Sequence, residues 1–298
     1  MTLDPNRPRY GIDLGGTNIK LGRVENGKVV RRMEVPTEHD ADACLATLAA
    51  GIAELSDGET PQSVGIGLPG VIDAARTQVL DSPNLLFLQD LEMAARLQEA
   101  CGCPVQLEND ANVAALGEAR CGAGQDHEDF LFVTIGTGIG GGLLLGGELF
   151  IGPGGMGGEF GHLTVGHDRQ CGCGALGCLE AIASARAMET LAAQSLGKAQ
   201  PLKQLAEDAR NGDRDALAVF HTAGACLGDA MAQVVLLLDI RVFLFGGGGG
   251  PVLDLLRKPA RAVLNQRCFG RTADDFSMLP ASLGNDAGLL GAAYLEPA

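Results

Sequence analysis

One histidine and three cysteines lie close together near the middle of the chain. His162, Cys171, Cys173 and Cys178 fall within seventeen residues, and glycines alternate with the cysteines. One His and three Cys complete a tetrahedral zinc site and leave no position for water, so we predict a structural zinc ion in the segment 162–178. The alternative, a group of buried free thiols, explains neither the interleaved glycines nor the preceding histidine.

Two glycine-rich segments, 13–18 and 136–142, each form a predicted turn between two short strands. Backbone N–H groups exposed in such a turn can hold phosphate oxygens, and Asp13 at a strand end can hold Mg²⁺ or its waters. One such turn alone could equally be a plain glycine hairpin, but two of the same kind favour a nucleotide site. The residues that we assign to it are Asp13, Gly15, Gly16, Thr17, Asn18, Lys20, Thr137 and Gly138.

Five consecutive glycines, 246–250, follow a buried strand that we predict at 241–245. Bare glycines at the carboxyl end of a strand let a flat group such as adenine lie against the backbone, whereas the alternative is a flexible turn. We assign Gly247 and Gly248 to the nucleotide. The glycine spacing at 65–70 and 136–141 matches a dinucleotide fingerprint, but no convincing helix follows either segment, which argues against a Rossmann fold.

Asn109 and Asp110 lie where a predicted strand passes into a predicted helix. At such a junction Asp110 could be an ordinary N-cap, and the position taken alone favours that interpretation. The hypothesis that Asp110 is a catalytic base beside Asn109 would explain the Asn-Asp pair at the end of a strand.

The elements that position these residues fall into two successive blocks, and each block opens with strands joined as a hairpin. Between the first strands the turn Asn26-Gly27 is a strong hairpin signal. Helices and a further strand follow in each block, as the spacing of apolar residues indicates. The predicted strands span 10–13, 19–24, 28–35, 63–68, 105–107, 130–135, 143–145, 148–151 and 241–245, and the predicted helices span 41–56, 92–100, 185–196, 201–210, 214–238 and 285–295, with another beginning at Asp110.

This order predicts an α/β protein with two similar domains and a cleft between them. We expect an N-terminal α/β domain at 1–120 and a C-terminal α/β domain at 121–284, because the segment 122–129 is polar and contains glycine. The closing helix, within 285–298, is expected to pack on the first domain.

The composition describes a folded and acidic chain. Of 298 residues 46% are hydrophobic and 20% are charged, and 22 basic against 37 acidic residues give a net charge of −15. This charge argues against nucleic acid or an anionic membrane as the partner, although a local basic patch could still hold a phosphate group. Nine cysteines in uneven positions, and a start without an apolar core, lead us to expect a cytoplasmic protein.

Taken together, these motifs resemble the ROK family (repressor, open reading frame, kinase) of ATP-dependent sugar kinases. The motifs at 13–17, 108–111, 136–142, 158–162 and 171–180 occur in the order of that family, and the resemblance runs from Tyr10 to the final helix. It implies two actin-like, ribonuclease-H-like domains hinged over a central cleft, commonly in homodimers. It also implies ATP and Mg²⁺ as cofactors beside the structural Zn²⁺.

The resemblance also implies roles for individual residues. Asn109 and Asp110 would grip the sugar, and Asp110 would take the proton of the attacking hydroxyl. His162 would use one ring nitrogen for zinc and the other for the sugar. The remaining residues expected to contact the sugar are Gly70, Asn84, Glu159 and Glu180.

Glucose, phosphorylated on its 6-hydroxyl, is the substrate that the resemblance favours. Phe87 occupies a position where many members carry Trp, and kinases of N-acetylmannosamine, N-acetylglucosamine and fructose share nearly all of these residues. Two other classes are a repressor with an added helix-turn-helix and a non-catalytic sugar sensor. Nine residues before the first strand leave no room for the former, and a sensor would be expected to lack Asp110 or Asp13.

Overall fold

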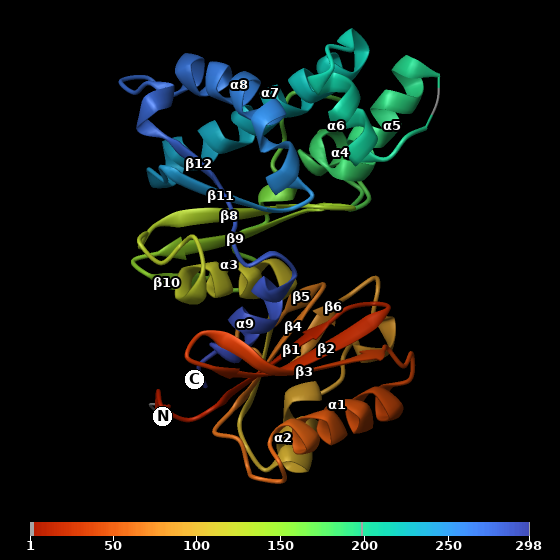
Figure 1. Ribbon diagram of the computed structural model, residues 1–298, viewed down its shortest axis with the longest axis vertical. Coiled ribbons are helices and arrows are strands. Elements are labelled where there is room, and N and C mark those ends of the chain that lie inside the picture. Colours follow the sequence, from red (N-terminus) through yellow and green to blue (C-terminus); the bar gives the residue numbers. More distant parts are fainter. Residues whose placement is uncertain (1–2, 198, 298) are drawn as a thin grey trace. The chain divides into compact units, whose positions relative to one another are not determined.

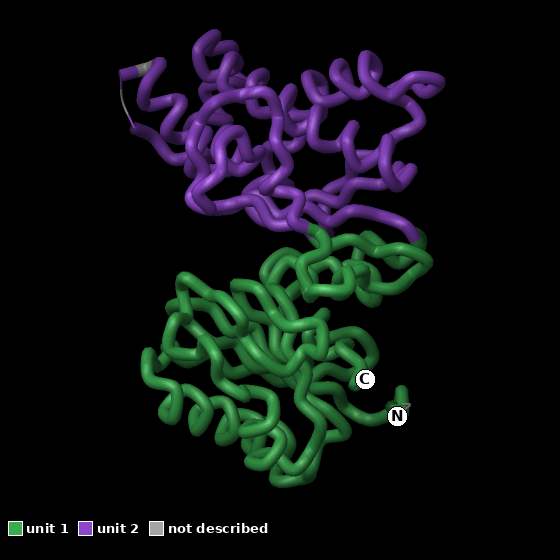
Figure 2. Tube along the Cα trace, turned by 180° about the vertical axis from the view of Figure 1, so that it is seen from behind, with its two compact units in different colours: residues 1–128, 142–158, 283–298 green, residues 129–141, 159–282 purple. Residues whose placement is uncertain are grey.

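The computed structural model describes residues 3–197 and 199–297 and divides the chain into two compact units, each built from segments distant in the sequence (Figure 2). Unit 1 comprises residues 1–128, 142–158 and 283–298, and unit 2 comprises 129–141 and 159–282. These units differ from the division that we predicted after residue 120 mainly in two segments, 121–128 and 142–158, which lie in unit 1.

The sheet of unit 1 has the strand order β3-β2-β1-β4-β7 (Figure 1). The first three strands are antiparallel, and β4 and β7 run parallel to β1. Asn26 and Gly27, in the turn between β2 and β3, have φ angles of 51° and 73°. This is the conformation of a type I′ turn, so the predicted hairpin is confirmed. The strands are β1 (Arg9–Leu14), β2 (Asn18–Glu25), β3 (Lys28–Pro36), β4 (Val64–Leu68) and β7 (Val105–Asn109).

Helices cover both faces of this sheet. On one face, α1 and α2 bury their apolar residues in a core with β1, β2 and β4. On the other face α9 packs on the sheet and on α3. The strands allow this approach through glycine, because a Cβ on Gly65 would overlap the carbonyl oxygen of Ala292 in α9. The helices are α1 (Ala41–Leu55), α2 (Met93–Cys101), α3 (Asp110–Cys121) and α9 (Ala287–Ala293).

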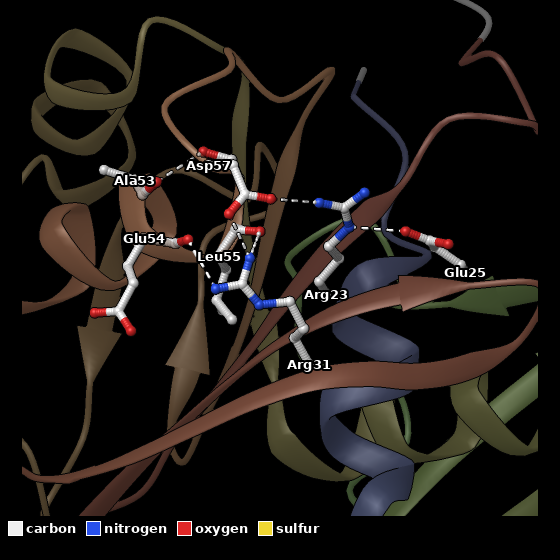
Figure 3. A network of polar contacts seen from close by, with 8 residues as sticks. Arg23, Glu25, Arg31, Ala53, Glu54, Leu55 and Asp57 are labelled. Carbon is white, nitrogen blue, oxygen red and sulfur yellow. Dashed lines mark hydrogen bonds and ion pairs between the residues drawn. The ribbon is translucent and has the colours of Figure 1, made fainter.

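Two arginines join the β2–β3 hairpin to the end of α1 (Figure 3). Arg31 Nη1 and Arg23 Nη1 donate to the two carboxylate oxygens of Asp57 at 2.6 and 3.2 Å, and Arg23 Nε donates to Glu25 at 2.8 Å. Arg31 also donates to the carbonyl oxygen of Glu54 near the end of the helix at 3.3 Å. This network fixes the edge of the sheet against α1.

The second five-stranded sheet has the order β10-β9-β8-β11-β12. β11 runs parallel to β8 and to β12, and β9 is antiparallel to β10. Residues 142–158, which begin within β9, belong to unit 1. There a Cβ on Gly142 would lie 2.5 Å from Cβ of Ala115 in α3. The strands are β8 (Phe130–Ile135), β9 (Ile139–Leu145), β10 (Glu148–Phe150), β11 (Val242–Gly247) and β12 (Ser277–Pro280).

The other helices of unit 2 pack around α7. The bounds of α5 and of α7 agree with the prediction. The sequence did not predict α8 or β12. Glycines and Pro251 at the start of α8, and Pro259 inside it, are typical of loops. α8 is nevertheless stable because it packs closely on α7, where a Cβ on Gly224 would lie 2.5 Å from Pro259. The helices are α4 (Glu180–Ala183), α5 (Ala185–Leu196), α6 (Leu202–Arg210), α7 (Arg214–Leu238) and α8 (Gly249–Arg267).

α7 is also the one helix, among the described residues, that is long and apolar enough to cross a membrane. Its sides contact α8, α5, α4 and α6, and residues such as Phe220, Leu227 and Met231 are buried. These contacts are those of a core helix in a folded unit.

The close contact of α9 with α3 gives a first prediction. Gly291→Ala should lower the free energy of unfolding by about 2 kcal/mol, because its Cβ would overlap the carbonyl oxygen of Val113 and force the helices apart. Urea unfolding followed by circular dichroism measures this change. Gly154→Ala is the matched control, since a Cβ there meets no atom within 4 Å. Equal stability of the two variants would show that α9 and α3 can separate without cost.

Candidate active site

The first glycine-rich turn joins β1 to β2 and holds a carboxylate beside an ammonium group. Asp13 and Lys20 face each other across the two strands, and Lys20 Nζ lies 3.0 Å from Asp13 Oδ2. The turn is closed by the Gly15 N–H, which donates to the Asn18 carbonyl at 3.0 Å, and by Thr37 Oγ1, which donates to the Gly15 carbonyl at 2.7 Å. The predicted nucleotide residues of unit 1 therefore lie together on one ordered hairpin.

Strand pairing places the other predicted residues of unit 1 at the same edge of the sheet. Asp13 pairs with Gly67 of β4, and Gly67 pairs with Glu108 of β7, so these strands end side by side at their carboxyl ends. Asn84 approaches the turn from a loop, because a Cβ on Gly16 would lie 3.5 Å from Cβ of Asn84. The carboxyl edge of a parallel sheet is where such folds bind ligands.

Asn109, not Asp110, is the N-cap of α3. Asn109 Oδ1 accepts hydrogen bonds from the N–H groups of Ala111 and Asn112 at 2.9 and 3.3 Å, and its Nδ2 donates to the carbonyl of Gly70 at 3.0 Å. The interpretation of Asp110 as the cap is therefore wrong. Asp110 is the first residue of the helix, and its exposed carboxylate lies at the positive end of the helix dipole.

A buried carboxylate that the sequence did not identify as a site residue holds this junction in place. Glu108, 3% exposed, accepts from Arg76 Nε, from the Asn109 N–H and from Asn112 Nδ2, each at 2.9 Å. Arg76 carries no sequence signal for this role, because it lies in a turn 32 residues earlier. These contacts fix the backbone immediately before Asp110.

The second glycine-rich turn, between β8 and β9, is held by Glu180 of α4. Gly136 N–H donates to the Gly138 carbonyl at 2.9 Å, and Glu180 Oε2 accepts from the Ile139 N–H at 3.0 Å. A Cβ on Gly138 would overlap that carboxylate oxygen, so a side chain there would displace Glu180 from the turn. Thr137 at the tip of the turn is exposed.

The run of five glycines is not one flexible turn. β11 extends two residues beyond the predicted end, to Gly247, and Gly249 begins the 19-residue helix α8. Gly247 has a φ of 59°, and a Cβ there would lie 2.8 Å from the carbonyl oxygen of Ile135. Gly248 therefore lies between the end of a strand and the amino terminus of a long helix, where N–H groups favour anions.

The predicted metal ligands come together in unit 2. The ligand atoms of His162, Cys171, Cys173 and Cys178 all lie within 4.8 Å of one another. Cys173 Sγ lies 3.7 Å from Cys178 Sγ, and Cys171 Sγ lies 3.8 Å from His162 Nδ1. A zinc ion with Zn–S bonds of about 2.3 Å separates tetrahedral ligands by about 3.8 Å, so the spacing and the donor set fit zinc.

The environment of the cluster connects it to Glu159 and Glu180. Glu180 Oε1 accepts from Cys171 Sγ at 3.4 Å, and His162 Nε2 lies 3.8 Å from Glu159 Oε2. Burial raises the pKa of the Cys171 thiol to about 12, so a bound cation is needed to make it a thiolate at neutral pH. The three residues predicted to contact a sugar from this half of the chain thus lie around the cluster.

Of the other six cysteines, Cys44, Cys103 and Cys268 are buried, as predicted for small core residues, and the remaining three are half-buried. Burial raises the pKa of all six thiols, and none belongs to a metal-binding group among the described residues. They are Cys44, Cys101, Cys103, Cys121, Cys226 and Cys268.

Comparison with known proteins agrees with this arrangement. The sequence model of the ROK family matches residues 9–298. A glucokinase of Thermotoga maritima is 34% identical over 98% of both chains. A ROK hexokinase from Thermus thermophilus matches with a TM-score of 0.85 and 35% identity, over 96% of this chain and 97% of that one. A ROK family glucokinase from Streptomyces griseus, in complex with glucose and AMPPNP, matches with a TM-score of 0.78 and 36% identity, over 96% and 98%.

The cluster gives a second prediction. Purified protein should contain about one zinc ion per chain, and Cys173→Ser should lose most of it, because a hydroxyl replaces a thiolate ligand. Metal content measured by mass spectrometry tests this. Cys101→Ser, which removes a thiol outside the cluster, should keep its zinc. Unchanged metal content in Cys173→Ser would contradict the assignment.

Proposed function

This chain belongs to the ROK family, and on that premise we propose that it transfers the γ-phosphoryl group of ATP to the 6-hydroxyl of glucose. It is an ATP-dependent sugar kinase with the two actin-like domains of its family. The observation that carries the proposal is the exposed Asp110 carboxylate, which the Asn109 cap holds at the carboxyl edge of the sheet that also bears Asp13. The identity with the Thermotoga glucokinase supports glucose as the hexose.

Asp110 acts as the base in this mechanism. Its carboxylate accepts the proton of the sugar hydroxyl while the hydroxyl oxygen forms a bond to the γ-phosphorus. The bond from that phosphorus to the bridging oxygen breaks, and ADP leaves. Asn109 orients the sugar, and its side chain is itself fixed by Gly70 and by the amino terminus of α3.

Each of the two glycine-rich turns, one in unit 1 and one in unit 2, can bind phosphate oxygens of the nucleotide. Backbone N–H groups at 15–17 and 137–138 donate to phosphate oxygens, and Lys20 adds a positive charge. Mg²⁺ beside Asp13 supplies neutralisation of the phosphate charge when it is bound. We assign Gly247 and Gly248, where β11 passes into α8, to the adenine, and Asn84, which adjoins the first turn, to the sugar.

A zinc ion held by His162, Cys171, Cys173 and Cys178 would fix the imidazole of His162 and would leave its second ring nitrogen for the sugar. Glu159 lies beside Nε2 of that ring, and Glu180 bridges the cluster and the second turn. Each carboxylate oxygen can accept a further hydrogen bond, so both acids can hold sugar hydroxyls. Loss of zinc would therefore weaken sugar binding as well.

We further propose that the chain works as a homodimer in the cytoplasm. Leu237 and Phe269 of unit 2 are 81% and 85% exposed, and a second copy would remove such apolar surface from water. None of the nine cysteines forms a disulfide in the structure, as expected in a reducing compartment.

The role of Asp110 gives a third prediction. Asp110→Asn should lower kcat by about 10²–10⁴-fold, because the amide cannot take the proton, while the affinity for glucose changes little. Coupled ADP-release kinetics and calorimetry measure the two effects. Asp126→Asn, the matched control, replaces an exposed aspartate of the same unit and should keep its activity. Near-normal turnover of Asp110→Asn would exclude Asp110 as the base.

The substrate gives a fourth prediction. In assays of ADP release from Mg-ATP, glucose should give the highest kcat/KM among glucose, mannose, fructose, N-acetylglucosamine and N-acetylmannosamine. A preference for an acetylated sugar or for fructose would keep the mechanism and change the substrate. Binding of a sugar without ADP release by any of them would favour a sugar sensor instead.

A further inference from the structure

A cavity of about 360 Å³ in unit 1 is lined by basic side chains and lies away from the proposed site. It lies between the start of β1, the β2–β3 turn, the end of α3 and the residue that follows α9. Its cationic lining consists of Arg7, Arg9, Lys28 and Arg120, and no residue that lines it in the described part of the chain is acidic.

This concentration of charge is unusual in so acidic a chain. Four of the 22 basic residues meet in one cavity of a protein whose net charge is −15. Arg7, Arg9 and Lys28 form no ion pair with any residue of 3–197 or 199–297, and Arg120 has only the 82% exposed Glu148 at 3.6 Å. Like charges held together repel one another, and an anion between them would relieve this repulsion.

Arg9 lines the cavity with a guanidinium group whose position is fixed by an aromatic ring. Its guanidinium carbon lies 4.7 Å from the centroid of the Tyr294 ring, which fixes the plane of the group. Arg9 Nη1 is buried and has no hydrogen-bond partner among the described residues. Buried N–H donors are nearly always paired, so the unpaired Nη1 shows that the protein does not satisfy the whole Arg9 guanidinium, whose group lines the basic cavity.

The remaining walls and the size of the cavity restrict the ligand. Val24, Cys121 and Tyr294 add apolar surface, and Gln125 adds an amide. A volume of about 360 Å³ is in the range of small-molecule sites.

We propose that this cavity binds a small anion that bears a phosphate group. The Arg9 and Arg120 guanidinium groups match phosphate oxygens with paired N–H donors, and Lys28 adds a point charge. The site lies at the opposite end of α3 from Asp110, about 16 Å along a twelve-residue helix. A ligand there does not overlap the proposed base, so the inference does not depend on the proposed function.

The tyrosines of this chain provide a local probe. The protein has no Trp and two Tyr, and Tyr10 is 5% exposed, so Tyr10→Phe leaves Tyr294 as the fluorophore beside Arg9. Titration of that protein with inorganic phosphate, and separately with glucose 6-phosphate, should change the Tyr294 emission at micromolar to millimolar ligand, and added salt should weaken the effect. Tighter binding of glucose 6-phosphate identifies a sugar phosphate as the ligand, and equal binding identifies free phosphate; both support the proposal.

Three charge variants in the Tyr10→Phe background complete the test. Arg9→Gln should weaken binding by about tenfold or more, and Lys28→Gln by about threefold, because each removes a charge from the cavity. Lys28 is exposed, so its variant should fold even if Arg9→Gln does not. Arg214→Gln, the same charge change at an exposed position of unit 2, should bind normally. The proposal is wrong if neither anion changes the emission, or if Lys28→Gln and Arg214→Gln bind alike.

Discussion

The parallel pairing of β1, β4 and β7 determines where the chemical groups of unit 1 lie. Their backbone hydrogen bonds bring Asp13, Gly67 and Glu108 into line, so that all three strands end at one edge. Side chains from positions almost a hundred residues apart are thus held by a rigid sheet rather than by flexible loops. The glycines of these strands let α9 and α3 pack against the sheet and keep the edge fixed.

At that edge, two neighbouring contacts hold the backbone in place. One is a buried ion pair and the other is a helix cap. Glu108 is removed from water, and a buried carboxylate is tolerated because Arg76, the Asn109 N–H and Asn112 satisfy it. Asn109 in turn caps α3 and contacts Gly70. The proposed base therefore has an exposed carboxylate on a backbone that has little freedom, which is what proton transfer at a defined position requires.

In unit 2 the metal ligands also need a fixed backbone, but they lie on a segment with almost no regular structure. Between residues 163 and 179 the described backbone pairs only through isolated bridges, Thr164 with Cys178 and Gln170 with Leu176. In these described residues no helix and no continuous strand orders the chain. A zinc ion bound by the four converging ligands would order this segment, and Glu180 connects the cluster to the turn at Gly138.

The sequence alone determined what depends on local chemistry. The Asn26-Gly27 hairpin, the periodic helices at 185–196 and 214–238, and the closely spaced zinc ligands could be predicted because their residues are near neighbours. Tertiary structure decided the rest. Packing on α7 makes α8 a helix in spite of Pro259, and Arg76 reaches Glu108 only through the fold. The basic cavity joins Arg9, Lys28, Arg120 and Tyr294 from four distant segments, and no local pattern records a contact that exists only after the chain has folded.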